Sequence, residues 1–316
     1  GKIMQNKEMR AVYAETLIEL AEKNKGIVIL EADLMRANGT GIFRDKFPER
    51  AFNIGVAEAN MVGVAAGMSA RGKIPFATTF GCFASRRAYD QFFLSANYAK
   101  LNVKLVGSDP GVSAAFNGGT HMPFEDVGLM RIIPGLIVFE PSDPYSLKQL
   151  LIQSAEHKGS TYMRLHRKAV PAIYTENDKF TLGKGIVIED GKDITLIGSG
   201  SVMMQEVIKA ADLLKKDGIS AAVIDMHTIK PIDADLIVKY ASQTGLIVTC
   251  ENHQIYNGLG SAVAEVVADK CPVTVKRIGV NDMFGEVGTQ DYLKERFGLT
   301  AQNIYATAKG ALSSKK

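Results

Sequence analysis

Short apolar runs of strand length alternate with helical segments along the chain, and this alternation constrains the fold more than any other feature. Strands are predicted at 27–30, 51–54, 74–78, 103–106, 136–139 and 161–165. Helices are predicted at 7–24, 57–71, 86–99 and after Pro144. Because several of these runs are apolar throughout, they indicate a mainly parallel sheet covered by helices on both faces. The predicted fold class is α/β.

A break in the alternation suggests two domains. Residues 168–185 contain Pro171 and many polar side chains, as expected of a linker. Strands then recur at 194–197, 221–224, 246–249 and 273–277, with helices at 202–216, 233–242 and 261–269. We therefore predict a first domain with its linker over 1–180, a doubly wound parallel sheet, and a smaller α/β domain over 181–316.

Composition excludes several classes of function. The chain is 46% hydrophobic with a net charge of +3, and its charges are interspersed. No basic block or long apolar run points to a nucleic-acid or membrane partner. The first ten residues lack the apolar core of a secretory signal. Cys82, Cys250 and Cys271 form no metal or disulfide pattern, so we expect reduced cysteines in a cytoplasmic protein.

Glu58 is the best single catalytic candidate. A predicted strand ends near Ile54, the chain turns at Gly55, and a helix begins with Glu58 in its first turn. Ligands of open α/β sheets bind at the carboxyl ends of strands. The carboxylate could simply complement the helix dipole. However, the helix behind it is apolar almost all round, and carboxylates in such desolvated positions are enriched at functional sites.

Three further segments follow strands. Residues 109–121 form a glycine-rich loop that ends at His121, which is either a proton-transfer or hydrogen-bonding residue or a capping residue of a surface loop. Phe80 and Phe83 are suited either to core packing or to a flat pocket for a planar ring. Arg164 and Arg167 flank His166, an arrangement that suits an anion such as phosphate or a charged anchor for the linker.

Two glycine pairs resemble dinucleotide-binding turns. They are Gly198 with Gly200 and Gly258 with Gly260, and each lacks the third glycine of that motif. We interpret both as tight turns between a strand and a helix.

Six segments together resemble the thiamine-diphosphate family that contains transketolase and 1-deoxyxylulose-5-phosphate synthase. They are Glu31-Ala-Asp33-Leu34, Phe52-Asn-Ile-Gly-Val-Ala-Glu58, Thr79-Phe80, Arg87-Ala-Tyr-Asp-Gln91, Gly119-Thr-His121 and Leu165-His-Arg167. Their order and spacing make the match specific. The resemblance covers that family's pyrimidine-binding and C-terminal domains, from about Met9 onward.

The resemblance implies roles for individual residues. Glu58 corresponds to the glutamate that hydrogen-bonds the aminopyrimidine of the cofactor and so helps to activate it for carbon–carbon bond cleavage in a ketose. Further cofactor contacts are implied for Phe80, Phe83, Asp33 and Ile54, and substrate contacts for His121, Arg167, Asn117 and Ser108.

The chain departs from the usual transketolase pattern at several substrate positions. Ser108 stands where a histidine is usual, and Asn117 stands where an aspartate is usual. Ala37 replaces a serine, and the tyrosine of the pyrimidine pocket is replaced near Arg86. The family's preference for donor and acceptor sugars therefore does not carry over to this chain, whereas the cofactor half of the site is expected to be intact.

The family holds the diphosphate through Mg²⁺ or Ca²⁺ at a Gly-Asp-Gly segment, and the sequence has no such segment in the right context. The expectation is therefore a split transketolase, an α₂β₂ assembly in which a separate N-terminal subunit binds the metal and diphosphate. Sugar phosphates are the expected substrates. The alternatives are the beta subunit of a 2-oxoacid dehydrogenase first component, a 1-deoxyxylulose-5-phosphate-synthase-like enzyme, and a non-catalytic interaction subunit with the same fold.

Overall fold

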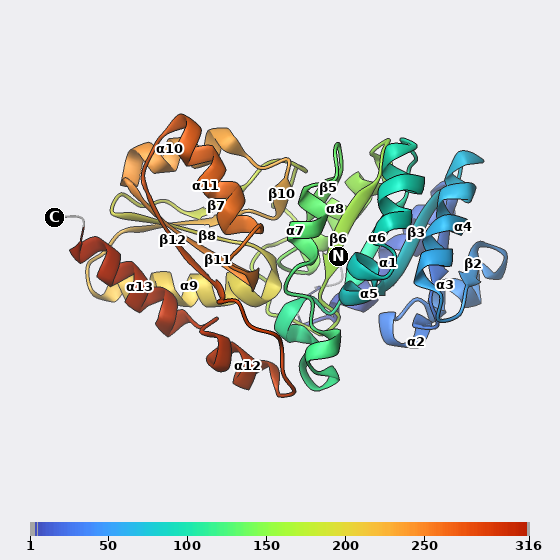
Figure 1. The fold of residues 1–316 in the computed structure, drawn as a ribbon, viewed down its shortest axis with the longest axis horizontal. Coiled ribbons are helices and arrows are strands. Elements are labelled where there is room, and N and C mark those ends of the chain that lie inside the picture. Colours follow the sequence, from blue (N-terminus) through green and yellow to red (C-terminus); the bar gives the residue numbers. More distant parts are fainter. Residues whose placement is uncertain (1–3, 5, 315–316) are drawn as a thin grey trace. The chain divides into compact units, whose positions relative to one another are not determined.

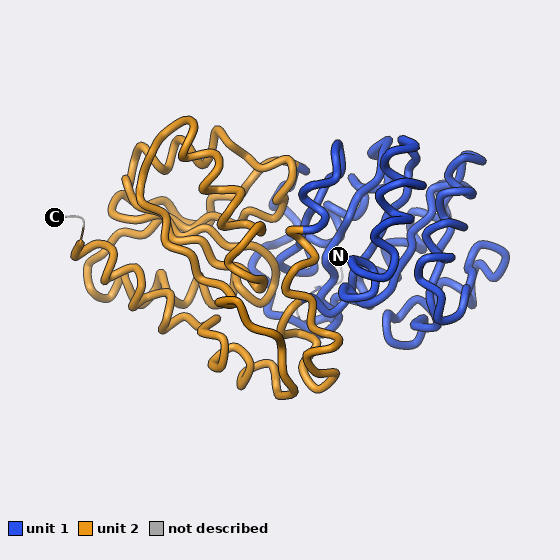
Figure 2. Tube along the Cα trace, viewed as in Figure 1, with its two compact units in different colours: residues 1–110, 129–182 blue, residues 111–128, 183–316 orange. Residues whose placement is uncertain are grey.

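The computed structural model describes residue 4 and residues 6–314, which divide into two compact units (Figure 2). The first unit comprises the described residues up to Pro110 together with Leu129–Leu182. The second comprises Gly111–Gly128 and the described residues from Gly183 onward. The assignment of residues 111–128 to the C-terminal unit was not predicted from the sequence, which placed this segment in the first domain.

The sheet of the first unit contains six strands in the order β5-β6-β4-β3-β1-β2 (Figure 1). Their bounds are β1 (Ile27–Glu31), β2 (Ala51–Asn53), β3 (Ile74–Phe80), β4 (Lys104–Ser108), β5 (Ile137–Phe139) and β6 (Thr161–Leu165). Every pairing among them is parallel. Strands β1, β4 and β6 are buried at every residue, as expected of central strands in a sheet covered on both faces. The predicted α/β class is confirmed for this unit.

Two groups of helices pack with this sheet. Helix α1 contacts α3 and α8, whereas α4 contacts α6 and η2. The helical elements are α1 (Met9–Lys23), α2 (Met35–Asn38), α3 (Gly41–Lys46), η1 (Pro48–Arg50), α4 (Glu58–Ala70), α5 (Gly81–Arg86), α6 (Tyr89–Gln91), η2 (Phe92–Tyr98), α7 (Asp126–Arg131) and α8 (Pro144–Glu156). Helix α7 begins in the second unit and ends in the first.

The region predicted as one helix over 86–99 is instead broken into pieces. Helix α5 ends at Arg86, α6 is short, and η2 is a π-helix. The side-chain amide of Asn97 donates to the carbonyl oxygen of Phe92 at 2.8 Å, so it competes for an acceptor that a regular helix would use. Such local competition is invisible to apolar periodicity, which is why one helix was predicted.

The second unit contains a five-stranded sheet in the order β12-β11-β8-β9-β7. Its strands are β7 (Ile186–Glu189), β8 (Ile194–Gly198), β9 (Ala221–Asp225), β11 (Leu246–Gln254) and β12 (Thr274–Val280), with β10 (Thr228–Lys230) after β9. Strand β7 pairs antiparallel with β9, and the other pairings are parallel. The predicted strands are confirmed, and β7 is an additional edge strand.

Helices lie on both sides of this second sheet (Figure 1). Helix α9 contacts α13, and α10 contacts α11. Their bounds are α9 (Gly200–Lys216), α10 (Ala234–Thr244), α11 (Leu259–Lys270), α12 (Gln290–Phe297) and α13 (Ala301–Ser313), and residues 111–128 add the short helices η3 (Gly111–Asn117) and η4 (Gly119–His121). Helix α9 begins at Gly200, two residues after β8 ends at Gly198, as predicted for a tight turn. Helix α11 begins at Leu259 after an irregular segment that follows Gln254, and Gly260 lies inside this helix. No helix in the described residues is long and apolar enough to cross a membrane.

The segment after β6 lacks regular structure but is fastened to helix α8. Asp143 caps this helix by accepting from the Ser146 amide at 2.8 Å, and its other oxygen accepts from the amides of Ile173 and Tyr174 at 3.1 and 3.0 Å. The Asp143 side chain therefore joins a helix start to the linker, and the whole residue is buried.

Replacing Asp143 with alanine should leave three backbone N–H groups, those of Ser146, Ile173 and Tyr174, without their hydrogen-bond acceptor. Because a buried donor without a partner costs about 1–3 kcal/mol, we expect Asp143→Ala to lower the free energy of unfolding by roughly 2–4 kcal/mol. Urea denaturation at neutral pH would measure this change. Asp178→Ala is the matched control, since it removes a carboxylate that accepts from the exposed Thr175 amide. A loss no larger than that of the control would contradict the assigned role of Asp143.

Candidate active site

The candidate residues of the first unit lie at or just beyond the carboxyl ends of its parallel strands. Strand β1 ends at Glu31, β2 at Asn53, β3 at Phe80, β4 at Ser108 and β6 at Leu165. Because parallel strands end at the same edge of a sheet, segments far apart in sequence meet there. This edge is the candidate active site of the first unit.

Glu58 is the first residue of α4, and a turn at Gly55 separates it from β2. Gly55 has a φ of 79°, a left-handed conformation that glycine adopts without strain. The Glu58 side chain is 5% exposed and accepts a hydrogen bond from Arg87 at 3.3 Å, whereas the Arg87 side chain is 53% exposed. The sequence thus places a buried carboxylate at the sheet edge, held by a cation that reaches in from solvent.

Phe80 and Phe83 are half-buried, and their ring centroids lie 6.0 Å apart at an interplanar angle of 41°. The Arg87 guanidinium lies 4.0 Å from the Phe83 centroid, and the Arg167 guanidinium lies 5.1 Å from that of Phe80. The rings are therefore not simple core residues. A buried carboxylate beside partly open aromatic rings fits a planar nitrogen heterocycle such as an aminopyrimidine.

Asp33 and Ile54 follow the ends of β1 and β2. Asp33 is exposed, and its amide donates to the Asn53 side chain at 2.9 Å. The Asn53 side-chain amide donates back to the Asp33 carboxylate at 3.2 Å, so the two loops hold each other. Ile54 is half-buried, and its amide donates to the Glu31 carbonyl oxygen at 2.8 Å. Both residues lie at the predicted edge.

Glu31 forms a buried polar network that the sequence did not reveal. Its carboxyl oxygens accept from Thr40 at 2.6 Å and from Asn38 at 2.9 Å. Burial raises the pKa of Glu31 to about 8, although both hydrogen bonds act to lower it. Ser108 donates to the Asn38 side-chain oxygen at 2.8 Å and is fully buried, so it is tied into this network.

Arg167 makes a two-pronged ion pair with the buried Asp109, in which its Nε donates at 2.7 Å. A third nitrogen donates to the Ala37 carbonyl oxygen at 3.2 Å, and Arg10 donates to the same oxygen at 3.0 Å. Arg10 is also held by Glu8, whose pKa is lowered mainly by that hydrogen bond. Arg10 and Arg167 thus both donate to the Ala37 carbonyl oxygen. Arg10 was not predicted as a site residue, because no motif or strand end lies near it in the sequence.

The predicted cluster of Arg164, His166 and Arg167 does not form one charged group. Arg164 is buried and pairs with the buried Glu140 at 3.1 Å. Burial lowers the pKa of His166 to about 4, with smaller contributions from the positive charges of Lys168 and Arg167. Arg164 lies within strand β6, whereas His166 and Arg167 follow it, so the three side chains have different surroundings. Of the two arginines, only Arg167 is partly exposed and could meet an anion.

His121 and Asn117 belong to the second unit. His121 is half-exposed, and its Nδ1 lies 2.8 Å from the Thr120 hydroxyl. Asn117 is exposed at the end of η3. Among the described residues, no group of three or more His, Cys, Asp or Glu is arranged to hold a metal ion. The three cysteines are free thiols, and Cys82 and Cys250 are buried.

Comparisons with known proteins identify the family. Residues 5–172 match "Transketolase, pyrimidine binding domain", and residues 183–304 match "Transketolase, C-terminal domain". The chain belongs to the transketolase family. The family and the α/β fold predicted from the sequence are therefore confirmed.

Two relatives match along nearly their whole length. The chain is 50% identical to "6-deoxy-6-sulfo-D-fructose transketolase subunit SqwH" of a Clostridium strain, over 95% of this chain and 93% of that protein. It is 43% identical to a "Putative transketolase C-terminal section" of Methanocaldococcus jannaschii, over 94% of each. A solved structure, "Split gene transketolase, inactive beta4 tetramer", aligns with a TM-score of 0.91 at 42% identity, over 98% of this chain and 99% of that one. The chain therefore carries the pyrimidine-binding and C-terminal domains of a transketolase.

The buried Glu31 predicts a specific pH dependence of stability. Its folded-state pKa of about 8 exceeds the usual 4.5, so between these values the folded state keeps a proton that the unfolded state has lost. The free energy of unfolding should therefore fall by about 1.4 kcal/mol per pH unit through this window because of Glu31 alone. Glu31→Gln should flatten that slope and be more stable than wild type near pH 8.

Urea denaturation at several pH values between 5 and 8 would test this. Gln at position 31 keeps the size of the side chain and a hydrogen-bonding partner for Asn38 and Thr40. Parallel slopes for wild type and variant would show that Glu31 is ionised in the folded protein.

Proposed function

We propose that this chain is the C-terminal subunit of a thiamine-diphosphate-dependent transketolase that transfers a two-carbon ketol unit between anionic sugars. The observation that carries the proposal is the buried Glu58 carboxylate at the strand-end edge, which shares Arg87 with the Phe83 ring in a chain of the transketolase family. When bound, thiamine diphosphate supplies the carbon nucleophile and electron sink for carbon–carbon bond cleavage.

The residues of the first unit would bind and orient the pyrimidine ring. Glu58 would share a proton with a ring nitrogen, and its burial would keep water from competing for that proton. Phe80, Phe83 and Ile54 would line the ring, and Asp33 would lie near the thiazolium. Arg87 would hold the Glu58 carboxylate in place, since it donates to Oε1 at 3.3 Å.

Substrate contacts are proposed for residues of each unit separately. We assign His121 and Asn117 to the hydroxyl and carbonyl groups of the sugar, and Arg167 with Arg10 to its terminal anion. The guanidinium of Arg167 already donates to the Asp109 carboxylate and to the Ala37 carbonyl oxygen. An anion would therefore bind the remaining N–H groups of this guanidinium. Ser108 is buried and donates to the Asn38 side chain, so we assign it a role in positioning neighbouring residues and not a direct contact with the substrate.

A phosphate and a sulfonate are both candidate anions. The relative that is 50% identical is named for 6-deoxy-6-sulfo-D-fructose, whose terminal group is a sulfonate. Each anion presents three oxygens to the same arginines. We therefore propose a ketose that carries either group as the donor.

An N-terminal transketolase subunit is the proposed partner. It would supply the site for the diphosphate and for Mg²⁺ or Ca²⁺, in an α₂β₂ assembly. Two features support a chain contact near Glu58. Helix α4 leaves Gly63 and Gly67 exposed with open space beside them, which permits close approach of another backbone. The similar split-gene protein is described as inactive when it forms a beta4 tetramer.

The decisive experiment is co-expression with a separately encoded N-terminal transketolase subunit. The complex should convert xylulose 5-phosphate plus ribose 5-phosphate, or 6-deoxy-6-sulfofructose plus an aldose phosphate, when thiamine diphosphate and Mg²⁺ are present. The isolated chain should be inactive. Turnover of pyruvate alone would favour the 2-oxoacid dehydrogenase alternative and would reject the proposal.

Glu58→Gln in this complex should lower kcat by about 100-fold or more, because the amide cannot share the proton. The variant keeps the size of the side chain and the acceptor for Arg87. Thiamine diphosphate affinity, followed by titration of the complex, should change much less than kcat. Near-normal turnover would remove Glu58 from the mechanism.

Arg167→Gln should raise KM for a charged ketose by about 10- to 100-fold, as expected for the loss of a charge-assisted hydrogen bond. The companion change Asp109→Asn avoids leaving a buried carboxylate without its partner. KM for an uncharged ketose should change little in the double variant. An equal change in KM for charged and uncharged ketoses would show that Arg167 does not bind the terminal anion.

A further inference from the structure

Residues 111–128 combine buried flanks with an exposed tip. Gly111–Ala115 and Met122–Phe124 are buried, whereas Phe116, Asn117 and Thr120 are exposed and His121 is half-exposed. Ala115, just before the tip, has a φ of 48°, which is strained for a residue with a side chain. Such strain persists only where the surroundings hold the backbone firmly.

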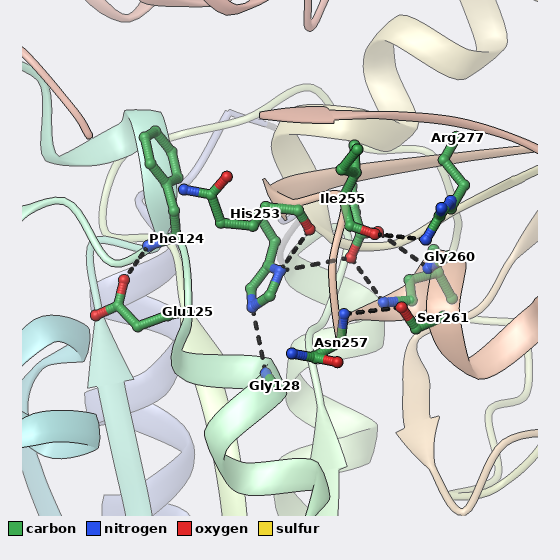
Figure 3. A network of polar contacts seen from close by, with 12 residues as sticks. Phe124, Glu125, Gly128, His253, Ile255, Asn257, Gly260, Ser261 and Arg277 are labelled. Carbon is green, nitrogen blue, oxygen red and sulfur yellow. Dashed lines mark hydrogen bonds and ion pairs between the residues drawn. The ribbon is translucent and has the colours of Figure 1, made fainter. Parts of the chain in front are cut away.

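The end of strand β11 supplies three successive holding contacts, and we call Asn252, His253 and Gln254 the β11 clamp. The Val112 amide donates to the Asn252 side-chain oxygen at 2.9 Å. The Gln254 amide donates to the Phe124 carbonyl oxygen at 2.8 Å. The Gly128 amide donates to Nε2 of His253 at 3.2 Å (Figure 3). The clamp therefore grips the segment before and after its tip.

His253 is itself fixed in one tautomer. Its Nδ1 lies 2.8 Å from the Gln254 carbonyl oxygen, which can only accept, so the proton sits on Nδ1 and Nε2 accepts from Gly128. The Glu251 carboxylate lies 3.8 Å from Nδ1 and accepts from the Leu259 and Gly260 amides at 2.7 and 3.0 Å. This carboxylate anchors the clamp to the start of helix α11.

The backbone of residues 111–128 packs closely on the clamp and on the chain that follows it. A Cβ atom at Gly111 would lie 2.0 Å from the Asn252 side-chain oxygen. At the other end, Gln254 donates to the Met283 carbonyl oxygen at 2.8 Å and accepts from the Asp282 amide at 3.0 Å. The chain that follows, at Gly285, packs so closely on Gly119 that a Cβ there would lie 2.1 Å from the Gly285 oxygen.

We propose that the β11 clamp is a positioning device that sets the affinity of the enzyme for its sugar substrate. It acts through the segment of the second unit that carries His121 and Asn117. A substrate-contacting group that moves out of hydrogen-bonding distance loses its contact with the sugar, so a loosened clamp should weaken sugar binding. The role of His121 in this inference rests on the proposed function.

Paired substitutions separate the contact from general packing. Glutamine at position 253 can place an acceptor where Nε2 lies, whereas asparagine is too short to reach Gly128. Likewise Asn252→Asp keeps the side-chain oxygen that holds Val112, and Asn252→Ala removes it. Thr300→Ala is the matched control, since it removes the cap of α13, where Thr300 accepts from the Asn303 amide, without touching residues 111–128.

The first readout is amide hydrogen exchange in the chain itself. His253→Asn should speed exchange of the Gly128 amide by about tenfold, and Asn252→Ala should do the same for Val112. His253→Gln, Asn252→Asp and Thr300→Ala should leave these amides near their wild-type rates. Unchanged exchange in both disruptive variants would overturn the clamp, whatever the enzyme's activity.

The second readout is kinetic, in the complex with the N-terminal subunit. His253→Asn should raise KM for the sugar by about tenfold or more while the affinity for thiamine diphosphate stays constant, and His253→Gln should restore KM. If KM and cofactor affinity change together, as for a general loss of stability, the positioning role is refuted. If the wild-type complex turns over no sugar, the proposed function fails, whereas the exchange result still decides whether the clamp exists.

Discussion

Parallel strand pairing is the constraint on which the candidate site depends. Each pairing from β2 to β5 in the first unit is parallel, so the segments after β1, β2, β3, β4 and β6 emerge at one edge. Glu58, Phe80 and Arg167 come from three such segments, and no local interaction in the sequence joins them. The parallel pairing of the strands thus brings residues that lie more than a hundred positions apart in sequence to the same edge of the sheet.

Candidate site residues that follow a strand could be predicted from the sequence, because the end of an apolar run marks the end of a strand. Glu58 and Phe83 were singled out in this way, and each lies at the sheet edge. Arg87 and Arg10 could not be found by the same reasoning. Their importance arises from partners that lie 29 and 27 positions away, Glu58 and the Ala37 carbonyl. Long-range polar pairing leaves no periodic signal, so such residues are visible only once the fold is known.

The fold was predicted better than the details of its helices for a related reason. Burial of apolar faces determines where strands and long helices form, and those elements were found in both units. In the π-helix that ends at Tyr98, the Asn97 side chain competes for the backbone oxygen of Phe92. Likewise, Arg164 lies within β6 and pairs with the buried Glu140, whereas Arg167 follows the strand and pairs with Asp109. Composition carries no information about either choice.

The chain crosses between its units after Pro110, and the structure fixes the backbone on each side of that crossing. In the first unit, Arg167 holds Asp109, whose φ of 54° is left-handed. In the second, the Asn252 side chain holds the Val112 amide. Each of these contacts thus lies within one unit, so the last residues of the first unit and the first residues of the second are ordered by separate side chains. Ordering the backbone on each side in this way removes conformational freedom that the folding of that unit has to offset.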